Sequence, residues 1–384
     1  MNGTMSPNLA GYRFHQLLDT GEVGGGNLVA LAIAGRLRAG GLASAVWSDT
    51  GPAIAAAGAA GLAVHSFDQA RLRAAGRLRG RWREWRLGRR LARHGPGLAH
   101  VSSAFLYGLV AQPLQASGLK RVAHVQLESP MADWQWAFRR PPDLIVTCAQ
   151  FLAAAVRPSL PEPVRDSARI VAVPNAVDTA RYAPGDRAAA KGAVGAPPNR
   201  PLLLMLANLA PHKGQMTAVE AVARLRARGI DVECWLAGVE RGGESDFAGK
   251  LTERIAALGV ADRVRLLGQR SDAPELLRAA DAFLLPSTNE GLPLSILEAQ
   301  SVGVPIVAAP TAGVPEIVAD GVTGFLVAAD DADGYAGRLA QILSDPGLAR
   351  SLATAGREQV KRRHEWSAYM AKIMDVYAEV LEER

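Results

Sequence analysis

Two glutamates in the second half of the chain have a spacing that could serve chemistry. Glu290 and Glu298 are separated by seven residues in NEGLPLSILEAQ, residues 289–300. Pro293 is of the type favoured in the first turn of a helix, so a helix is predicted to begin there. The free backbone N–H groups and the dipole of a helix start attract anions. The pattern therefore predicts one carboxylate at the mouth of an anion site and a second one to two turns along the helix.

A lysine is predicted at another strand end of the same half. Lys213 lies in ANLAPHKG, just after the strand expected over residues 202–208. Its ammonium group could neutralise a phosphate. Glutamates on a helix surface are usually only solvated. Here the nearby helix start and the lysine favour a ligand-binding role for the two glutamates. A ligand with hydroxyls for the carboxylates and phosphates for the lysine and N–H groups satisfies all of these residues, and a nucleotide-sugar is such a ligand.

The elements that would position these residues alternate between strand and helix. At 384 residues the chain is long enough for two domains. β-rich runs separated by Ala/Leu/Arg-rich helical stretches predict parallel sheets covered by helices. The expected strands are residues 14–18, 144–148, 170–174, 202–208, 232–238, 264–268, 282–287 and 306–309. We therefore predict an α/β fold of two doubly wound domains facing across a cleft, with ligands bound where the strands end.

The predicted boundaries follow from composition. Residues 182–201 are rich in Pro, Gly and Ala, which indicates a domain junction. We expect an N-terminal domain over 1–185, a linker over 186–201 and a C-terminal domain over 202–366. A closing helix is expected over 367–384, capped by Ser367 and crossing back to the N-terminal domain.

The second half resembles the retaining glycosyltransferases of family 4, which have the GT-B fold of two facing Rossmann-like domains. The resemblance covers most of residues 170–384, and the Glu–seven residues–Glu motif beside GVP and AGVPE is its most specific part. In the first half it rests on the glycines at 24–26 and the general layout. The matching stretches are VPNAVDTARYAP (173–184), LANLAPHKG (206–214), the run from VRLLG to GFLV (264–327) and the closing helix.

The resemblance implies roles for single residues. It implies that Glu298 binds the ribose hydroxyls, that Glu290 approaches the donor sugar and that Lys213 contacts the diphosphate. It also implies that the backbone at Gly25 and Gly26 approaches the phosphates and the reacting sugar. The other residues expected to bind the donor are Asn208, Arg270, Gly291, Leu292, Pro293 and Leu294.

Two positions depart from the family pattern. Ala207 and Asn208 replace the usual Gly-Arg pair, so stabilisation of the leaving group is expected to depend more on Lys213. The position of a family histidine near the reacting sugar holds Gln126 in VAHVQLES, residues 122–129. His124 lies two residues earlier on the same face of a strand and is a catalytic candidate, with a structural role as the alternative.

The activity expected from this resemblance is transfer of a sugar, a hexose type, from a nucleoside diphosphate-sugar to a glycan or lipid-linked acceptor. It would serve synthesis of cell-surface polysaccharide, lipopolysaccharide or glycolipid, with retention of configuration and without metal or other cofactor. Asp331 and Asp333 imitate a metal-binding Asp-x-Asp, but helix capping explains them. Two alternatives stay open: a glycoside hydrolase using Glu290 and Glu298, and a nucleotide-sugar-binding protein without activity.

Composition favours an intracellular setting. The two cysteines, Cys148 and Cys234, lie in apolar runs, which suits buried thiols in a reducing compartment. The start of the chain does not read as a signal peptide. Residues 98–119 are uncharged but fit a buried strand followed by a helix better than a membrane span. We expect a cytoplasmic protein.

An arginine-rich segment sets the charge of the chain. Residues 71–93 hold ten arginines and one glutamate, a net charge of +9, whereas the whole chain is +6. If residues 77–93 are helical, Leu78, Trp82 and Trp85 share one face. Tryptophan with arginine suits an anionic membrane surface. The alternative is that these apolar side chains pack on the domain. No nucleic-acid-binding module is recognisable, so nucleic acid is not expected as a partner.

Overall fold

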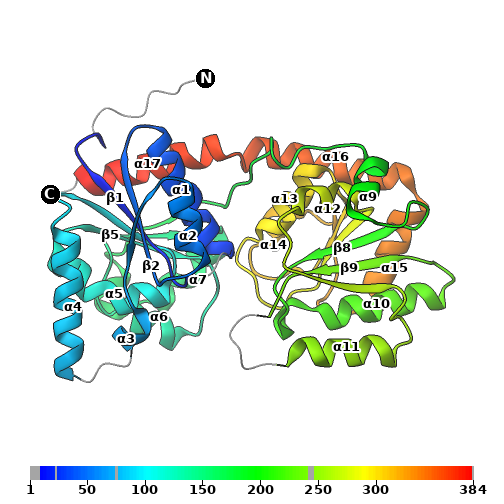
Figure 1. Cartoon of the computed structure of the whole chain (residues 1–384), viewed down its shortest axis with the longest axis horizontal. Coiled ribbons are helices and arrows are strands. Elements are labelled where there is room, and N and C mark those ends of the chain that lie inside the picture. Colours follow the sequence, from blue (N-terminus) through cyan, green and yellow to red (C-terminus); the bar gives the residue numbers. More distant parts are fainter. Residues whose placement is uncertain (1–8, 22–23, 74–76, 241–245, 383–384) are drawn as a thin grey trace. The chain divides into compact units, whose positions relative to one another are not determined.

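The computed structural model describes residues 9–21, 24–73, 77–240 and 246–382 (Figure 1). The chain divides into two units, one of Met1–Asn175 with Ser367–Arg384 and one of Ala176–Trp366. Each unit is a parallel sheet with helices packed on it, as the alternation of strands and helices predicts.

In the described part of the first unit, seven parallel strands have the order β3-β2-β1-β4-β5-β6-β7. The order reverses between β1 and β4, which pair side by side. Trp47 and Tyr107 are among the largest fully buried side chains of this unit. The strands are β1 Arg13–Leu17, β2 Ala43–Ser48, β3 Ala63–Ser66, β4 Gly97–Val101, β5 Lys120–Val125, β6 Leu144–Thr147 and β7 Ile170–Ala172.

The helices of the first unit include the predicted closing helix. They are α1 Gly25–Ala39, α2 Pro52–Ala59, α3 Gln69–Arg73, α4 Arg77–Ala92, α5 Ala104–Ser117, α6 Met131–Ala137, α7 Gln150–Ser159, α8 Glu162–Arg165 and α17 Trp366–Glu382. α17 packs beside β1, where Tyr377 stacks on Phe14 at 5.5 Å between ring centroids (Figure 1). The helix already includes Trp366, so Ser367 is not its cap.

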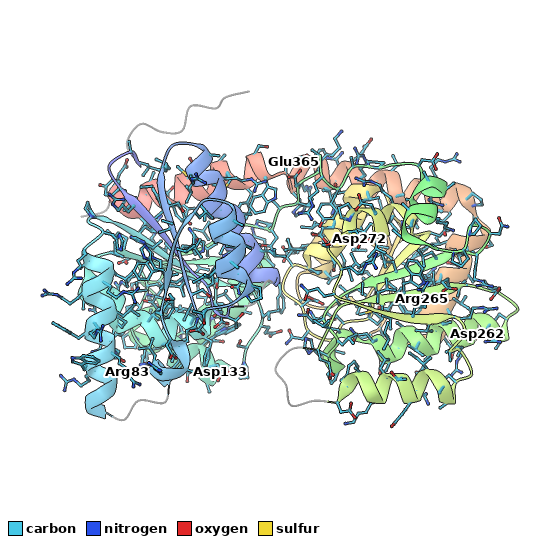
Figure 2. All side chains as sticks on the ribbon, in the orientation of Figure 1. Arg83, Asp133, Asp262, Arg265, Asp272 and Glu365 are labelled. Atoms are coloured by element: carbon cyan, nitrogen blue, oxygen red, sulfur yellow. The ribbon has the colours of Figure 1, made fainter. Side chains whose placement is uncertain are left out.

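The uncharged segment 98–119 forms the buried strand β4 and then α5, as expected. Ser103 caps α5 by accepting a hydrogen bond from the N–H of Leu106 at 3.0 Å. Across the residues that are described, no helix combines the length and the apolar character needed to span a membrane. The arginine-rich segment forms α3 and α4, and Arg83 ties them together by donating to the Arg71 carbonyl at 2.7 Å (Figure 2).

In the described part of the second unit, six parallel strands have the order β10-β9-β8-β11-β12-β13. The strands are β8 Leu202–Leu206, β9 Glu233–Ala237, β10 Val264–Gly268, β11 Ala282–Leu285, β12 Ile306–Ala308 and β13 Phe325–Leu326. The helices are α9 Arg187–Val194, α10 Gln215–Ala227, α11 Phe247–Ala257, α12 Ala273–Ala279, α13 Leu294–Val302, α14 Val314–Ile317, α15 Ala332–Ser344 and α16 Pro346–Arg363, with a 3₁₀ turn, η2, at Pro211–Lys213.

The segment expected as a linker, 186–201, is part of the second unit. Asp186 caps α9 by accepting from the N–H of Ala189 at 3.0 Å, and α9 packs against α12. Ala190 and Lys191 are buried in that contact. The alanine-rich core of the segment forms a helix because alanine favours helix and offers an apolar face, despite its Pro- and Gly-rich flanks. The division between the units falls near residue 175 instead of at 186–201.

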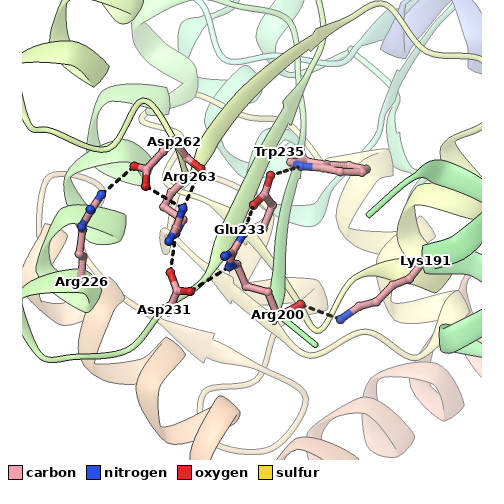
Figure 3. A network of polar contacts seen from close by, with 8 residues as sticks. All are labelled: Lys191, Arg200, Arg226, Asp231, Glu233, Trp235, Asp262 and Arg263. Carbon is pink, nitrogen blue, oxygen red and sulfur yellow. Dashed lines mark hydrogen bonds and ion pairs between the residues drawn. The ribbon is translucent and has the colours of Figure 1, made fainter. Parts of the chain in front are cut away.

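Charged side chains form a network where the strands of the second sheet begin (Figure 3). Arg200, just before β8, bonds Asp231 at 2.9 Å and Glu233 at 3.2 Å. Glu233 is the first residue of β9 and also accepts from the Trp235 indole at 3.1 Å. Arg263, just before β10, bonds Asp231 as well. These contacts fix the starts of three neighbouring strands at the edge opposite their carboxyl ends.

Asp281 fixes the start of β11 in the same way and gives a test of this edge. It accepts from Lys191 and Arg187 and from the N–H of Leu202, each at 2.8 Å. Asp281→Ala should lower the free energy of unfolding by about 2 kcal/mol, because it leaves the buried Lys191 ammonium without its counter-charge. Asp262→Ala removes an exposed carboxylate that pairs with Arg226 and Arg263, and it should change stability much less, because water screens such surface pairs. Urea denaturation of both variants measures the difference, and equal losses would contradict the expectation.

Candidate functional site

Two predicted site residues meet at the point where the strand order of the second unit reverses. β8 and β11 are neighbours there, and the loops after them leave from the same edge of the sheet. Lys213 lies in η2 after β8, and Glu290 lies in the loop after β11. The Lys213 ammonium contacts a Glu290 carboxylate oxygen at 2.8 Å, and both side chains are largely buried. The structure thus brings together two residues predicted from separate motifs.

Backbone contacts hold the two loops against each other. The His212 carbonyl accepts from the N–H of Thr288 at 2.8 Å and from the Ser287 hydroxyl at 2.9 Å. Burial, ahead of the nearby Lys213 charge, lowers the pKa of His212 below its usual value. The site lysine and glutamate are therefore fixed by the loops themselves as well as by their ion pair.

Gly214 makes this close approach possible and can be tested. Its φ is +78°, and a Cβ there would lie 2.0 Å from the Pro286 carbonyl oxygen. Gly229 has a φ of +76° with open space around it, so it serves as a matched control for strain alone. Gly214→Ala should cost about 2 kcal/mol more stability than Gly229→Ala, because the backbone of the β11 loop must shift. Thermal denaturation compares the two, and equal losses would show that the approach is not constrained.

The start of α13 lies next along the chain. Pro293 precedes the first helical residue, Leu294, and no side chain caps this end. Gly291 and Leu292 are buried in the loop before it, and the Gly291 carbonyl accepts from the N–H of Gly313 at 3.0 Å. A helix start without a side-chain cap offers its first N–H groups to an anion, as expected from the position of Pro293.

Glu298 lies in the second turn of α13 and bonds a residue that sequence reasoning left out. The Tyr182 hydroxyl donates to its carboxylate. Burial raises the pKa of Glu298 to about 7, while this hydrogen bond and the charge of Arg181 act in the opposite direction. Tyr182 is held by Ser301, whose hydroxyl donates to its carbonyl at 2.9 Å. Tyr182 lies in the stretch 173–184 that resembles the family, so its place in the sequence could have marked it as a site residue.

Two further predicted residues have local roles in this structure. The Asn208 carbonyl accepts from the Gln215 side chain at 2.8 Å, which ties the loop after β8 to the start of α10. Arg270, after β10, pairs through two nitrogens with Asp272 at 2.8 and 2.5 Å. Arg270 is thus engaged at the surface by a neighbour two residues away.

The glycines predicted in the first unit begin α1 at the carboxyl end of β1. Gly25 has open space around its Cα, whereas a Cβ on Gly26 would lie 2.8 Å from the Gln126 amide group. The Gln126 side chain donates to the carbonyls of Ser102 at 3.1 Å and Gly26 at 3.4 Å. Gln126, which the family resemblance aligns with a histidine, therefore contacts the glycine loop directly. It was not among the predicted site residues.

His124, the catalytic candidate of the first unit, lies in a buried environment. It is 1% exposed, and its Nδ1 lies 3.2 Å from Nε2 of His100. His100 in turn contacts the Tyr377 hydroxyl of α17 at 2.5 Å. Burial lowers the pKa of His124 to about 3. Its Nε2 is buried and lacks a hydrogen-bond partner among the described residues, so a role for His124 in catalysis stays a prediction.

The predicted capping role of the Asp-x-Asp segment is confirmed. Asp331 accepts from the N–H of Gly334 at 2.8 Å and caps α15. Asp333 instead pairs with Arg224 and Arg228 at the surface. In the part of the chain that can be described, no cluster of three or more His, Cys, Asp or Glu is placed to hold a metal ion. Cys148 and Cys234 are buried and are not joined to a disulfide partner among the described residues.

Two family models account for most of the chain. Residues 186–359 match the model of the glycosyl transferases group 1, and residues 23–181 match that of glycosyltransferase family 4. The chain is a member of the family 4-type glycosyltransferases. This membership does not favour the glycoside hydrolase or the inactive binding protein considered as alternatives.

Relatives and solved structures agree with this membership. A D-inositol 3-phosphate glycosyltransferase of Actinosynnema mirum is 37% identical over 194 residues, 49% of this chain and 46% of the relative. One of Catenulispora acidiphila is 35% identical over 255 residues, 63% and 58% of the two chains. This chain thus spans about half the length of the curated relatives that it matches.

Among solved structures, Anabaena HepE with UDP-glucose has a TM-score of 0.83 at 21% identity, covering 95% of this chain and 99% of HepE. Sucrose-phosphate synthase of Thermosynechococcus elongatus has a TM-score of 0.80 at 20% identity, covering 97% and 100%. These likenesses establish that this glycosyltransferase family member has the GT-B fold, with two Rossmann-like domains.

Proposed function

We propose that the protein transfers a hexose-type sugar from a nucleoside diphosphate-sugar to a glycan or lipid-linked acceptor, with retention of configuration and without a metal ion. The observation that carries the proposal is the Lys213–Glu290 contact of 2.8 Å beside the uncapped start of α13. Cation, carboxylate and free N–H groups lie at the strand ends where a doubly wound sheet binds its ligand. We expect the product to enter cell-surface polysaccharide, lipopolysaccharide or glycolipid.

Each group has a part in the proposed reaction. The diphosphate would bind Lys213 and the N–H groups of α13, which stabilise the charge that develops as it leaves. Glu298 would accept hydrogen bonds from the ribose hydroxyls, and Glu290 would hold the transferred sugar. The bond from the anomeric carbon to the phosphate oxygen breaks while a bond to the acceptor oxygen forms on the same face. The acceptor proton passes to the departing phosphate.

Known proteins support a nucleotide-sugar donor. Structures of Anabaena HepE contain UDP and UDP-glucose, and the curated relatives are named glycosyltransferases. Those relatives are named for D-inositol 3-phosphate, but the match spans about half of each chain. We therefore propose the acceptor class from the exposed arginine- and tryptophan-bearing helix described below.

Thermal denaturation in the presence of UDP, GDP, ADP and their sugar conjugates tests the donor. At 100 times its Kd, the true nucleotide should stabilise the fold by about 2.7 kcal/mol through mass action. A glycoside hydrolase would ignore all of them. With the donor known, NMR of the product anomeric signal tests retention, and activity in EDTA tests metal independence. Absence of stabilisation by any nucleotide would overturn the proposal.

The arginine-rich helix suits an anionic membrane surface. The predicted helix is α4, and Trp82 and Trp85 on it are 55% and 56% exposed, so these two do not pack on the domain. Arg86 lies over the Trp82 ring at 4.7 Å, and Arg89 lies over Trp85 at 5.4 Å. The side chain of Leu78 lies outside the described residues. We propose that α4 holds the enzyme on the inner face of the cytoplasmic membrane, near a lipid-linked acceptor.

Vesicle co-sedimentation tests the membrane proposal. The protein should bind vesicles with anionic lipid and should lose binding in high salt, because each basic residue near the surface contributes about 1 kcal/mol. The variant with Arg81, Arg83, Arg86 and Arg89 changed to glutamine should bind at least tenfold more weakly. A matched control changes four exposed arginines of the second unit, Arg226, Arg254, Arg350 and Arg362. Indifference to lipid charge, or equal loss in both variants, would contradict the proposal.

A further inference from the structure

A cavity lies in the first unit, at the sheet edge where β1, β2 and β3 begin. Its volume is about 460 Å³. The charged, histidine and alanine residues among its lining are Arg13, His15, Arg38, Ala43, Ala45, Ala63, His65 and His94. Gly25 and Gly26 follow the carboxyl end of β1, so the cavity lies at the opposite end of the strands from the proposed donor-binding loop.

Small alanine side chains on the sheet leave room for this cavity. Ala43 pairs with Arg13, and Ala45 pairs with both His15 and Ala63, so the alanines lie together on one face of the sheet. Further along β2 on that face, Trp47 is fully buried. All described lining residues are basic, polar or apolar, and none is a carboxylate. The alanine methyl groups therefore form an apolar surface in the cavity, and Arg13 and Arg38 are the charged residues of its described lining.

His15 carries an unused hydrogen-bond donor at this cavity. The Trp47 indole N–H donates to Nδ1 of His15 at 3.0 Å. An indole nitrogen only donates, so the neutral imidazole must carry its proton on Nε2. Nε2 is buried and lacks a hydrogen-bond partner among the described residues, and His15 is 1% exposed. Leaving a buried donor unpaired is unfavourable, so an acceptor that reached this N–H from the cavity would stabilise the arrangement.

The groups around this donor favour an anion. Arg13 is exposed at the rim, and Arg38 uses one guanidinium nitrogen on the Ala60 carbonyl at 2.7 Å. The His94 ring lies 5.3 Å from that of His15 and 4.8 Å from that of His65. Arginine forks match the oxygen geometry of phosphate.

We propose that this cavity is a second ligand site, separate from the donor site, which binds a phosphorylated small molecule through Arg13, Arg38 and His15. The volume exceeds that of inorganic phosphate alone and falls within the range of about 300–1,000 Å³ of small-molecule sites. The phosphate accepts hydrogen bonds from His15 Nε2 and the two guanidinium groups. The rest of the molecule packs against Ala43, Ala45 and Ala63.

Protonation of the histidines is linked to this binding. Burial, followed by the charges of neighbouring groups, lowers the pKa of His15 to about 3 and that of His65 and His94 below the usual value. Those neighbours are the other histidines together with Arg13 and Arg90. Arg38 faces the same cavity. A bound anion offsets these charges and raises each pKa, so the anion binds more tightly as the pH falls.

Calorimetric titration of inorganic phosphate into full-length Lys213→Met protein tests the site, because this variant removes the lysine of the donor site. One phosphate per chain is expected. Arg13→Gln or Arg38→Gln added to this protein should weaken binding at least tenfold, and Arg362→Gln should not. Sulfate, which does not titrate in this range, should bind several-fold more tightly at pH 6 than at pH 8, and His94→Gln should reduce that difference.

Absence of saturable binding, or equal affinity after Arg13→Gln and Arg38→Gln, would overturn the second site. If Lys213→Met is unstable, the same titration of the unaltered chain remains decisive. Arg13→Gln should then remove one phosphate and leave donor binding unchanged. Failure of this site would leave the proposed transferase reaction intact, because that reaction depends on nucleotide stabilisation and turnover.

Discussion

Replacing Lys213 with methionine is expected to lower turnover 10²- to 10³-fold, equivalent to about 3–4 kcal/mol of lost transition-state stabilisation. The lysine is the cation expected to contact the diphosphate, and Asn208, where the family resemblance leads us to expect arginine, brings no charge. The substitution should also destabilise the fold by about 3 kcal/mol, because the Glu290 carboxylate, 6% exposed, loses its partner at 2.8 Å. Steady-state kinetics and urea denaturation measure the two effects.

A double-mutant cycle separates catalysis from stability. Glu290→Gln combined with Lys213→Met removes both charges, so most of the lost stability should return. Turnover should stay low, because neither the phosphate contact nor the sugar contact is restored. Lys250→Met changes an exposed lysine on α11 and should alter neither quantity. If the double variant recovered turnover together with stability, Lys213 would be only a structural partner of Glu290.

Strand ends and turn residues made part of this site predictable from the sequence. Lys213 and Glu290 each follow a recognisable apolar strand, and Pro293 marks a helix start. Parallel strands release their ligand-binding loops at one edge, so the convergence of these residues follows from the fold class. Their direct contact of 2.8 Å does not follow from the fold class. It depends on the hydrogen bond to the His212 carbonyl and on the close approach to Pro286 that Gly214 permits.

Contacts between distant segments account for what sequence reasoning missed. The buried setting of His124 depends on its neighbour His100, which contacts Tyr377 from the other end of the chain. Tyr182 reaches Glu298 across more than one hundred residues. By contrast, Arg270 pairs with Asp272, only two residues away, and this local pairing could have been predicted from the sequence.

Glu298 should make the stability of the protein fall as the pH rises through neutrality. Its pKa is raised from 4.5 to about 7, so between these values the folded state holds a proton that the unfolded state has released. The stabilisation is complete below pH 4.5 and is lost as the pH rises to about 7. At about 1.4 kcal/mol for each pKa unit, the loss is at most about 3–4 kcal/mol, and partial exposure of the side chain reduces it.

Nucleotide binding should have the opposite pH dependence. Ribose hydroxyls donate to the ionised carboxylate, so binding the nucleoside diphosphate lowers the pKa of Glu298 and releases a proton near pH 7. Affinity should therefore increase several-fold between pH 6 and pH 8 beyond the change caused by the nucleotide phosphate itself. Glu298→Gln, titrated with the same nucleotide, isolates that phosphate contribution and should also remove the pH dependence of stability.

Tyr182→Phe sharpens this test. It removes the hydroxyl that hydrogen-bonds Glu298 and opposes the rise in pKa, so the carboxyl should ionise at a still higher pH. Calorimetric titrations at pH 6, 7 and 8 should then show the gain in nucleotide affinity displaced to higher pH in Tyr182→Phe and absent in Glu298→Gln. An identical pH profile in all three proteins would mean that Glu298 does not contact the nucleotide, and its assignment to the ribose would fail.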